Sequence, residues 1–155
     1  MPPDHVHFNG SVNLADAESV MREIAARLPS GLRRIPDGET GDRGNWTSFQ
    51  LQKFRRLSWL VPAQPPDTAE VGYNPDIGYA QAYVGSYAIF AALRDQGVIP
   101  AGVRFQVEYP TPLASISLYI VPEQRQALLA SYTRAVFADL ARLLSEIPHG
   151  EVAVQ

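Results

Sequence analysis

The chain has no cysteine among its 155 residues. This excludes a disulfide framework, a thiolate nucleophile and a cysteine-ligated zinc site within the sequence. No apolar run approaches the roughly 20 residues that a membrane span needs. The N-terminus also lacks the basic and apolar regions of a signal peptide. From these absences we expect a cytoplasmic protein with no membrane partner.

Positive charge is sparse. Thirteen Lys and Arg residues stand against 16 Asp and Glu, which gives a formal net charge of −3. The adjacent arginines, Arg33–Arg34 and Arg55–Arg56, form isolated pairs that are typical of a solvated surface. Proteins that bind nucleic acids through phosphate contacts need a basic patch or stripe. We therefore expect no nucleic-acid partner.

Strand and helix patterns alternate along the chain. Alternation of this kind implies right-handed crossovers and a parallel sheet. The pattern predicts strands at residues 6–12, 32–35, 103–107 and 151–155, and helices at 13–28, 47–57, 79–96 and 123–146. Residues 58–78 read as an irregular, proline-rich insertion. Residues 1–155 then form one α/β domain, because the chain on either side of the insertion is too short to fold twice.

The predicted fourth strand is the last element of the sequence, and nothing follows to cover it. This order predicts a (β/α)8 barrel of the TIM type. The chain supplies about its first half, with four parallel strands and their covering helices, and this half-barrel is incomplete on its own. Binding sites of such folds collect where strands end and loops begin. Polar segments occupy three such places, at residues 9–11, 37–39 and 108–111.

The densest polar segment is IPDGETGDRGNW, residues 35–46. Gly38 would let the backbone turn so that Glu39 faces a pocket, although the same residues could form a plain turn with Glu39 in solvent. Arg43 could pair locally with Asp42 or clamp a carboxylate or phosphate. Trp46 could pack the loop down or offer a stacking platform.

The remaining candidates carry weaker signals. Gly10 and Ser11 could form either a simple turn or a nest of N–H groups that holds an anion. His5 and His7 lie on one side of an extended segment, but no third ligand accompanies them, so we expect no metal site. Tyrosines spaced four residues apart favour helix packing over a cofactor site; they are Tyr79, Tyr83 and Tyr87.

Four segments resemble the catalytic barrel of the cobalamin-independent methionine synthases. Residues 7–11 (HFNGS) are similar to the Gly-Ser motif of its first strand, and residues 37–46 to its second-strand Gly-Glu segment. Residues 108–113 stand where the family has its third turn, and residues 151–155 resemble its fourth strand. The sequence of residues 34–46 most resembles the uroporphyrinogen-decarboxylase/methionine-synthase-like branch.

The resemblance implies roles for individual residues. The Ser11 hydroxyl and the adjacent backbone of Gly10 would hold a substrate carboxylate. Glu39 would accept hydrogen bonds from a substrate amino group, and Thr111 would line the pocket. Arg43 is a further candidate for binding the substrate, while no catalytic residue is assigned. The family's zinc ligands lie in the second half of its barrel, so this chain alone is expected to bind no cofactor.

The function that follows is a methyltransferase-like activity on a small amino-acid-like or thiol substrate. A second hypothesis is a non-catalytic half-barrel that binds or assembles, either with its own copies or with a complementary half-barrel chain. The motive for it is the open edge of the predicted fourth strand. A third hypothesis is a decarboxylase-like activity on a polycarboxylate, which would need more arginines around the pocket than Arg43 alone.

Overall fold

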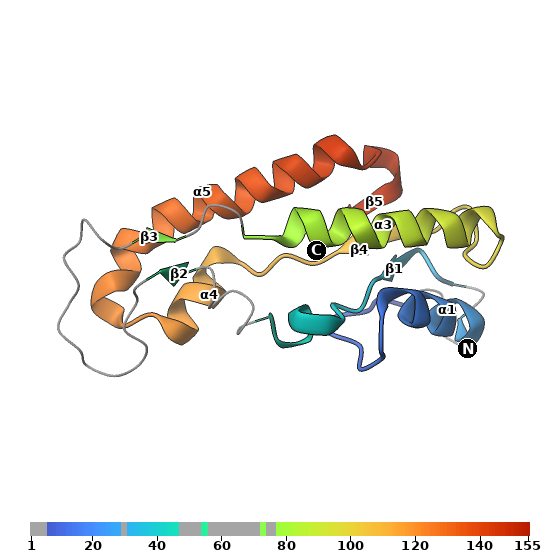
Figure 1. Cartoon of the computed structure of the whole chain (residues 1–155), viewed down its shortest axis with the longest axis horizontal. Coiled ribbons are helices and arrows are strands. Elements are labelled where there is room, and N and C mark those ends of the chain that lie inside the picture. The colour runs from blue at the N-terminus through green and yellow to red at the C-terminus, as the bar shows by residue number, and fades with distance from the viewer. Residues whose placement is uncertain (1–5, 29–30, 47–53, 56–71, 74–76) are drawn as a thin grey trace.

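The computed structural model describes residues 6–28, 31–46, 54–55, 72–73 and 77–155. Its centre is a three-stranded parallel sheet in the order β1–β4–β5 (Figure 1). The strands are β1 (Arg34–Pro36), β4 (Arg104–Val107) and β5 (Val152–Val154). Phe105 of the central strand lies opposite Ile35 on one side and Val152 on the other. The carboxyl ends of all three strands therefore meet at one edge.

The predicted half of a TIM barrel with four parallel strands is wrong. The described part of the chain is a small α/β domain with three parallel strands and four α-helices. The predicted first strand makes only one isolated bridge, between Val6 and Leu32. Beyond it, the Phe8 carbonyl accepts a hydrogen bond from the Gln106 side chain (2.9 Å), and Gly10 has a φ of 86°. Side chains thus bond part of this segment, and further along the Val12 N–H donates to the Gly38 carbonyl (2.9 Å) without forming a regular strand.

The helices start and end largely where local signals place them. The Asp16 side chain accepts a hydrogen bond from the Ser19 N–H at the start of α1 (Ala17–Arg27). The two other predicted helices in the described part are α3 (Tyr79–Asp95) and α5 (Pro122–Glu146). An unpredicted helix, α4 (Pro112–Tyr119), has Thr111 as its cap and proline in its first position.

The segment between residues 47 and 76 is described only in part. A helix was predicted at 47–57, but Phe54–Arg55 forms a short strand, β2, and the rest of that range lies outside the described residues. β2 pairs antiparallel with β3 (Gly72–Tyr73). β3 falls inside the predicted insertion at 58–78, of which only residues 72–73 and 77–78 are described.

Helix α3 packs against both α5 and α1, and the three lie one below another in Figure 1. The ring of Phe105, on the central strand, contacts α3 at Tyr83, Tyr87 and Phe90, with centroids 5.5–6.2 Å apart. Tyr79 and Tyr83 are also buried, in agreement with the predicted packing role of the tyrosine stripe, although Tyr79 lines a cavity as well. The core thus lies between the helices and one face of the sheet.

A carboxylate from α5 caps the start of α3. Gly78 precedes α3 and has no side chain to offer. Asp139 instead accepts hydrogen bonds from the Ala80 N–H and from the Tyr109 hydroxyl, both at 2.7 Å. This buried group therefore joins α5, α3 and the segment that follows β4.

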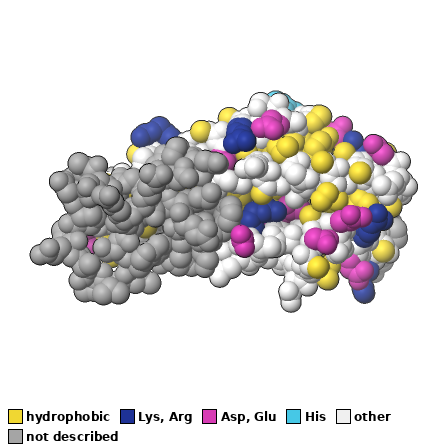
Figure 2. Space-filling view, in the orientation of Figure 1, with side chains coloured by type: hydrophobic (Ala, Val, Ile, Leu, Met, Phe, Trp, Pro, Cys, Tyr) yellow, Lys and Arg dark blue, Asp and Glu magenta, His cyan; other side chains and the backbone are white. Residues whose placement is uncertain are grey.

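The face shown in Figure 2 mixes acidic and basic side chains over the described part, without a continuous basic area. Within the described residues, no helix is long and apolar enough to cross a membrane. The expectations about nucleic-acid partners and cellular compartment stay predictions.

Candidate ligand-binding pocket

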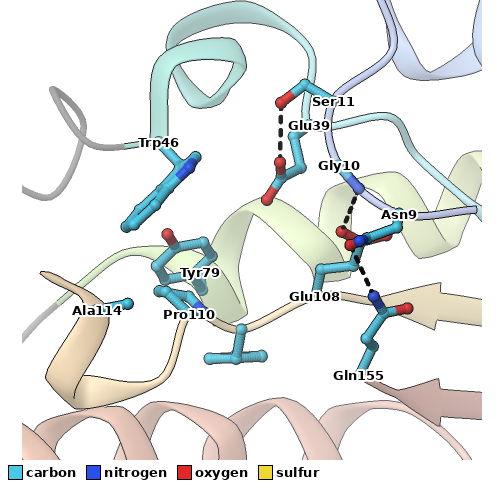
Figure 3. Close-up of a pocket in the computed structure, with 11 residues that line it drawn as sticks. Asn9, Gly10, Ser11, Glu39, Trp46, Tyr79, Glu108, Pro110, Ala114 and Gln155 are labelled. Atoms are coloured by element: carbon cyan, nitrogen blue, oxygen red, sulfur yellow. Dashed lines mark hydrogen bonds between the residues drawn. The ribbon is translucent and has the colours of Figure 1, made fainter.

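A cavity of about 290 Å³ lies at the carboxyl ends of the three parallel strands. Its walls come from the N-terminal segment, the loops after β1 and β4, the first residues of α3 and α4, and the residue after β5 (Figure 3). The lining residues are Asn9, Gly10, Ser11, Glu39, Trp46, Tyr79, Glu108, Tyr109, Pro110, Ala114 and Gln155.

Glu39 enters the pocket from a constrained turn after β1. It has a φ of 49°, a left-handed conformation that is uncommon for a residue other than glycine. Its N–H donates to Asp37 Oδ1 (3.0 Å), and the Ser11 hydroxyl donates to its Oε2 (3.0 Å). Gly38 before it is also left-handed, and an added Cβ would meet Val20 Cγ2 at 2.8 Å. The close passage over α1 thus fixes where Glu39 can point.

Glu108 enters from the loop after β4, and hydrogen bonds hold both its carboxylate and its backbone. Its carboxylate accepts hydrogen bonds from the Gly10 N–H (3.1 Å) and from Gln106 Nε2 (2.7 Å). The Tyr83 hydroxyl donates to its backbone carbonyl (2.6 Å) and accepts from its N–H (2.9 Å). The carboxylate is therefore oriented before any ligand arrives.

The Glu39 carboxyl is affected by its burial and by the charge of Glu108. Burial is the largest influence on Glu39 and raises the pKa of its carboxyl above the ordinary value, while the Ser11 hydrogen bond opposes this rise. The negative charge of Glu108 adds to the rise, and Arg43 counteracts it. Among the described lining residues none is Lys or Arg. The pocket is thus better suited to a cation than to an anion.

Aromatic rings form the opposite wall. Trp46 and Tyr79 lie on the side of the cavity away from Glu108 (Figure 3). The rings of Tyr79 and Tyr109 pack with centroids 5.1 Å apart. Burial, followed by the hydrogen bond to Asp139, raises the pKa of Tyr109 well above its usual range, so this phenol keeps its proton. The rings offer apolar surface and π faces to a ligand.

Arg43 lies behind the pocket and does not line it. Its Nη2 donates to Asp37 Oδ2 at 2.5 Å, and both side chains are buried. The local ion pair expected for Arg43 therefore forms with Asp37, and Asp42 lies exposed. Thr111, the other predicted site residue outside the lining, accepts from the Ala114 N–H (3.3 Å) as the cap of α4.

Three predicted site residues meet in the pocket: Gly10, Ser11 and Glu39. That they touch a ligand stays a prediction. Glu108 and Tyr109 were not among the predicted site residues, although they belong to the polar segment 108–111 at a predicted strand end. Trp46, for which packing and stacking were both open, also lines the pocket.

The described side chains contain no group of three or more His, Asp or Glu residues placed to hold a metal ion. The expectation that this chain alone binds no cofactor stays a prediction.

Comparison with known proteins adds no identity. The chain matches no protein-family model, no curated protein and no solved structure. The resemblance to methionine-synthase-like proteins therefore stays a prediction that rests on the quoted segments.

Proposed function

We propose that the pocket binds a small amino-acid-like molecule by its ammonium group, as the substrate site of a methyltransferase-like protein. One observation carries the proposal: Glu39 and Glu108 share a cavity whose described lining holds no basic side chain. Charge-assisted hydrogen bonds from an ammonium to such carboxylates are among the stronger ones in proteins. The methyl-transfer part of the proposal rests on the family resemblance alone.

The hydrogen bonds favour an ammonium anchor over a carboxylate anchor. The resemblance assigns the Ser11 hydroxyl and the Gly10 backbone to a substrate carboxylate. In the structure the Ser11 hydroxyl donates to Glu39, and the Gly10 N–H donates to Glu108. Both donors thus serve the chain's own carboxylates, so a ligand carboxylate would have to displace them.

The arrangement speaks against the decarboxylase-like alternative. A polycarboxylate needs cationic partners, and Arg43 is already paired with Asp37 outside the lining. An anion placed beside Glu39 and Glu108 would also meet like charge. We therefore do not carry this alternative further.

Three related probes test the proposal on the whole chain by calorimetry. They are methionine, the amine 3-(methylthio)propylamine and the acid 4-(methylthio)butanoic acid. We expect the amino acid and the amine to bind and the acid not to bind. Glu39→Gln should weaken amine binding about tenfold or more, since one hydrogen bond to a charged group contributes ~1.5–3 kcal/mol.

Glu146→Gln is the matched control, because Glu146 is an exposed glutamate on α5 that does not line the cavity. It should bind the amine as the unaltered chain does. Equal binding of the acid and the amine would show that the ammonium is not the anchor. Full affinity in Glu39→Gln would show that Glu39 does not bind it.

A further inference from the structure

Behind the pocket, three buried side chains connect the backbones of its two glutamates. They are Asp37, Arg43 and Tyr83, and none of them lines the cavity. Glu39 and Glu108 are 69 positions apart, on loops that follow different strands. Their relative placement therefore depends on what joins the two loops.

The first link runs from Glu39 to Arg43 through Asp37. One carboxylate oxygen of Asp37 accepts the Glu39 N–H (3.0 Å), and the other accepts Arg43 Nη2 (2.5 Å). Asp37 is 1% exposed and Arg43 is 7% exposed. The bond to Asp37 supports the left-handed φ of Glu39, a conformation that persists only where the surroundings impose it.

The second link runs from Arg43 to Glu108 through Tyr83. The guanidinium carbon lies 4.8 Å from the centroid of the Tyr83 ring. The Tyr83 hydroxyl then bonds both the carbonyl and the N–H of Glu108. Desolvation, the largest influence, raises the pKa of Tyr83 well above its usual value, so the phenol retains the proton that it donates.

The network is not the arrangement that stability alone would favour. Burying an ion pair costs desolvation that the attraction often fails to recover. Arg43 Nη1 is also buried without a hydrogen-bond partner among the described residues, which carries a further cost. Packed apolar side chains would fill this space without the free-energy cost of desolvating charges, but they would not form hydrogen bonds with the Glu39 N–H or the Glu108 backbone.

We propose that Asp37, Arg43 and Tyr83 are positioning residues that set the separation and orientation of the Glu39 and Glu108 carboxylates. Their effect on ligand affinity rests on the function proposed above. Their effect on the two carboxylates does not, and it can be measured without a ligand.

Tyr83→Phe tests the proposal, because it removes one hydroxyl and keeps the ring under Arg43. Tyr87→Phe is its control, one turn further along α3. The Tyr87 hydroxyl donates to Glu151 Oε2 (2.6 Å), away from the cavity, so both variants lose one hydroxyl and its hydrogen bonding. We expect Tyr83→Phe to weaken binding of 3-(methylthio)propylamine roughly fivefold to tenfold and Tyr87→Phe by less than about twofold.

The ligand-free measurement is a carbon-13 NMR titration of the side-chain carboxyls. In the unaltered chain Glu39 should titrate above the ordinary glutamate pKa. In Tyr83→Phe its pKa should move part of the way toward the ordinary value, because the Glu108 backbone loses both hydrogen bonds to Tyr83 while the burial of Glu39, the larger cause, remains. In Tyr87→Phe it should stay where it is, so a general loss of stability cannot mimic the result.

Arg43→Lys is a second variant for the case in which Tyr83→Phe does not fold. It keeps a positive charge for Asp37 and removes the planar group that stacks on Tyr83. It should also change the Glu39 titration, because the cation that faces Glu39 and the contact with Tyr83 are both altered. An unchanged titration in a folded variant of either kind would overturn the positioning role. If the unaltered chain binds none of the amine probes, the proposed function fails, while the titration still decides the positioning role.

Discussion

At the scale of single residues, the Glu39 carboxyl is where the fold and the proposed chemistry conflict. Its burial disfavours the charged form, and Glu108 adds to this effect. The charged form is nevertheless the one that an ammonium ligand requires. The folded chain therefore holds a group that costs stability in the absence of a ligand.

This conflict predicts a pH dependence of stability. The folded chain keeps the Glu39 proton to a higher pH than the unfolded chain, whose value lies near 4.5. In the window above 4.5 the folded state binds more protons, so the free energy of unfolding falls as pH rises. Glu39→Gln cannot titrate at this position. The free energy of unfolding of this variant, minus that of the unaltered chain, should therefore increase as pH rises through this window.

Urea unfolding of both chains from about pH 4 to about pH 7 measures the difference. Glu146→Gln controls for the loss of one exposed acidic group. If the difference in free energy of unfolding between Glu39→Gln and the unaltered chain stayed constant with pH, the pKa of Glu39 would not be raised in the folded chain.

At the scale of elements, helix α3 contains a glycine that makes the helix less stable than an alanine would. Gly85 is an exposed residue within α3, and an added Cβ would meet nothing within 4 Å. Glycine inside a helix costs ~0.5–1 kcal/mol relative to alanine. Gly85→Ala should therefore raise the free energy of unfolding by about that amount, measured by urea or thermal unfolding.

Gly38→Ala is the comparison variant. It adds the same Cβ methyl group at a position where there is no room for it. There the left-handed φ of 75° and the contact with Val20 both oppose a Cβ. Strain and overlap together should lower the free energy of unfolding by about 2–4 kcal/mol. If both substitutions had the same effect, the tight turn before Glu39 would not be as described.

At the scale of the whole molecule, Asp139 holds distant parts together. Its carboxylate accepts from α3 at Ala80 and from Tyr109 after β4, while it belongs to α5. Asp139→Ala leaves both donors without this acceptor in a buried place. We expect a loss of about 2–4 kcal/mol in the free energy of unfolding. Glu146→Ala, at an exposed ion pair on the same helix, should cost less than about 1 kcal/mol.

Thermal and urea unfolding of the two variants provide this measurement. If Asp139→Ala lowered the free energy of unfolding by no more than Glu146→Ala does, the Asp139 cap on α3 would contribute little to stability.

Most helices and the buried strands of the parallel sheet could be predicted because their signals are local. The spacing of apolar residues, the Asp16 cap and the stop at Gly97 depend only on nearby residues. The predicted first strand was wrong although its apolar residues have a strand-like pattern. Its backbone bonds to the Gln106 and Glu108 side chains and to the Gly38 carbonyl, all distant in sequence, and forms no regular strand pairing. Thr111 lies outside the cavity lining, and its hydroxyl caps α4, so its role as a site residue stays a prediction.

The sequence by itself determined where α1, α3 and α5 lie, where β1, β4 and β5 lie and that Gly10, Ser11 and Glu39 belong to one edge. These follow from periodicity, caps and the order of strands and helices. Only the tertiary structure decided that Glu108 faces Glu39 and that Arg43 pairs with Asp37. The Gly10–Glu108 hydrogen bond joins residues 98 positions apart, and no local pattern specifies such a partner. Burial and hydrogen bonding in three dimensions select it, since each buried polar group needs a partner wherever the fold can supply one.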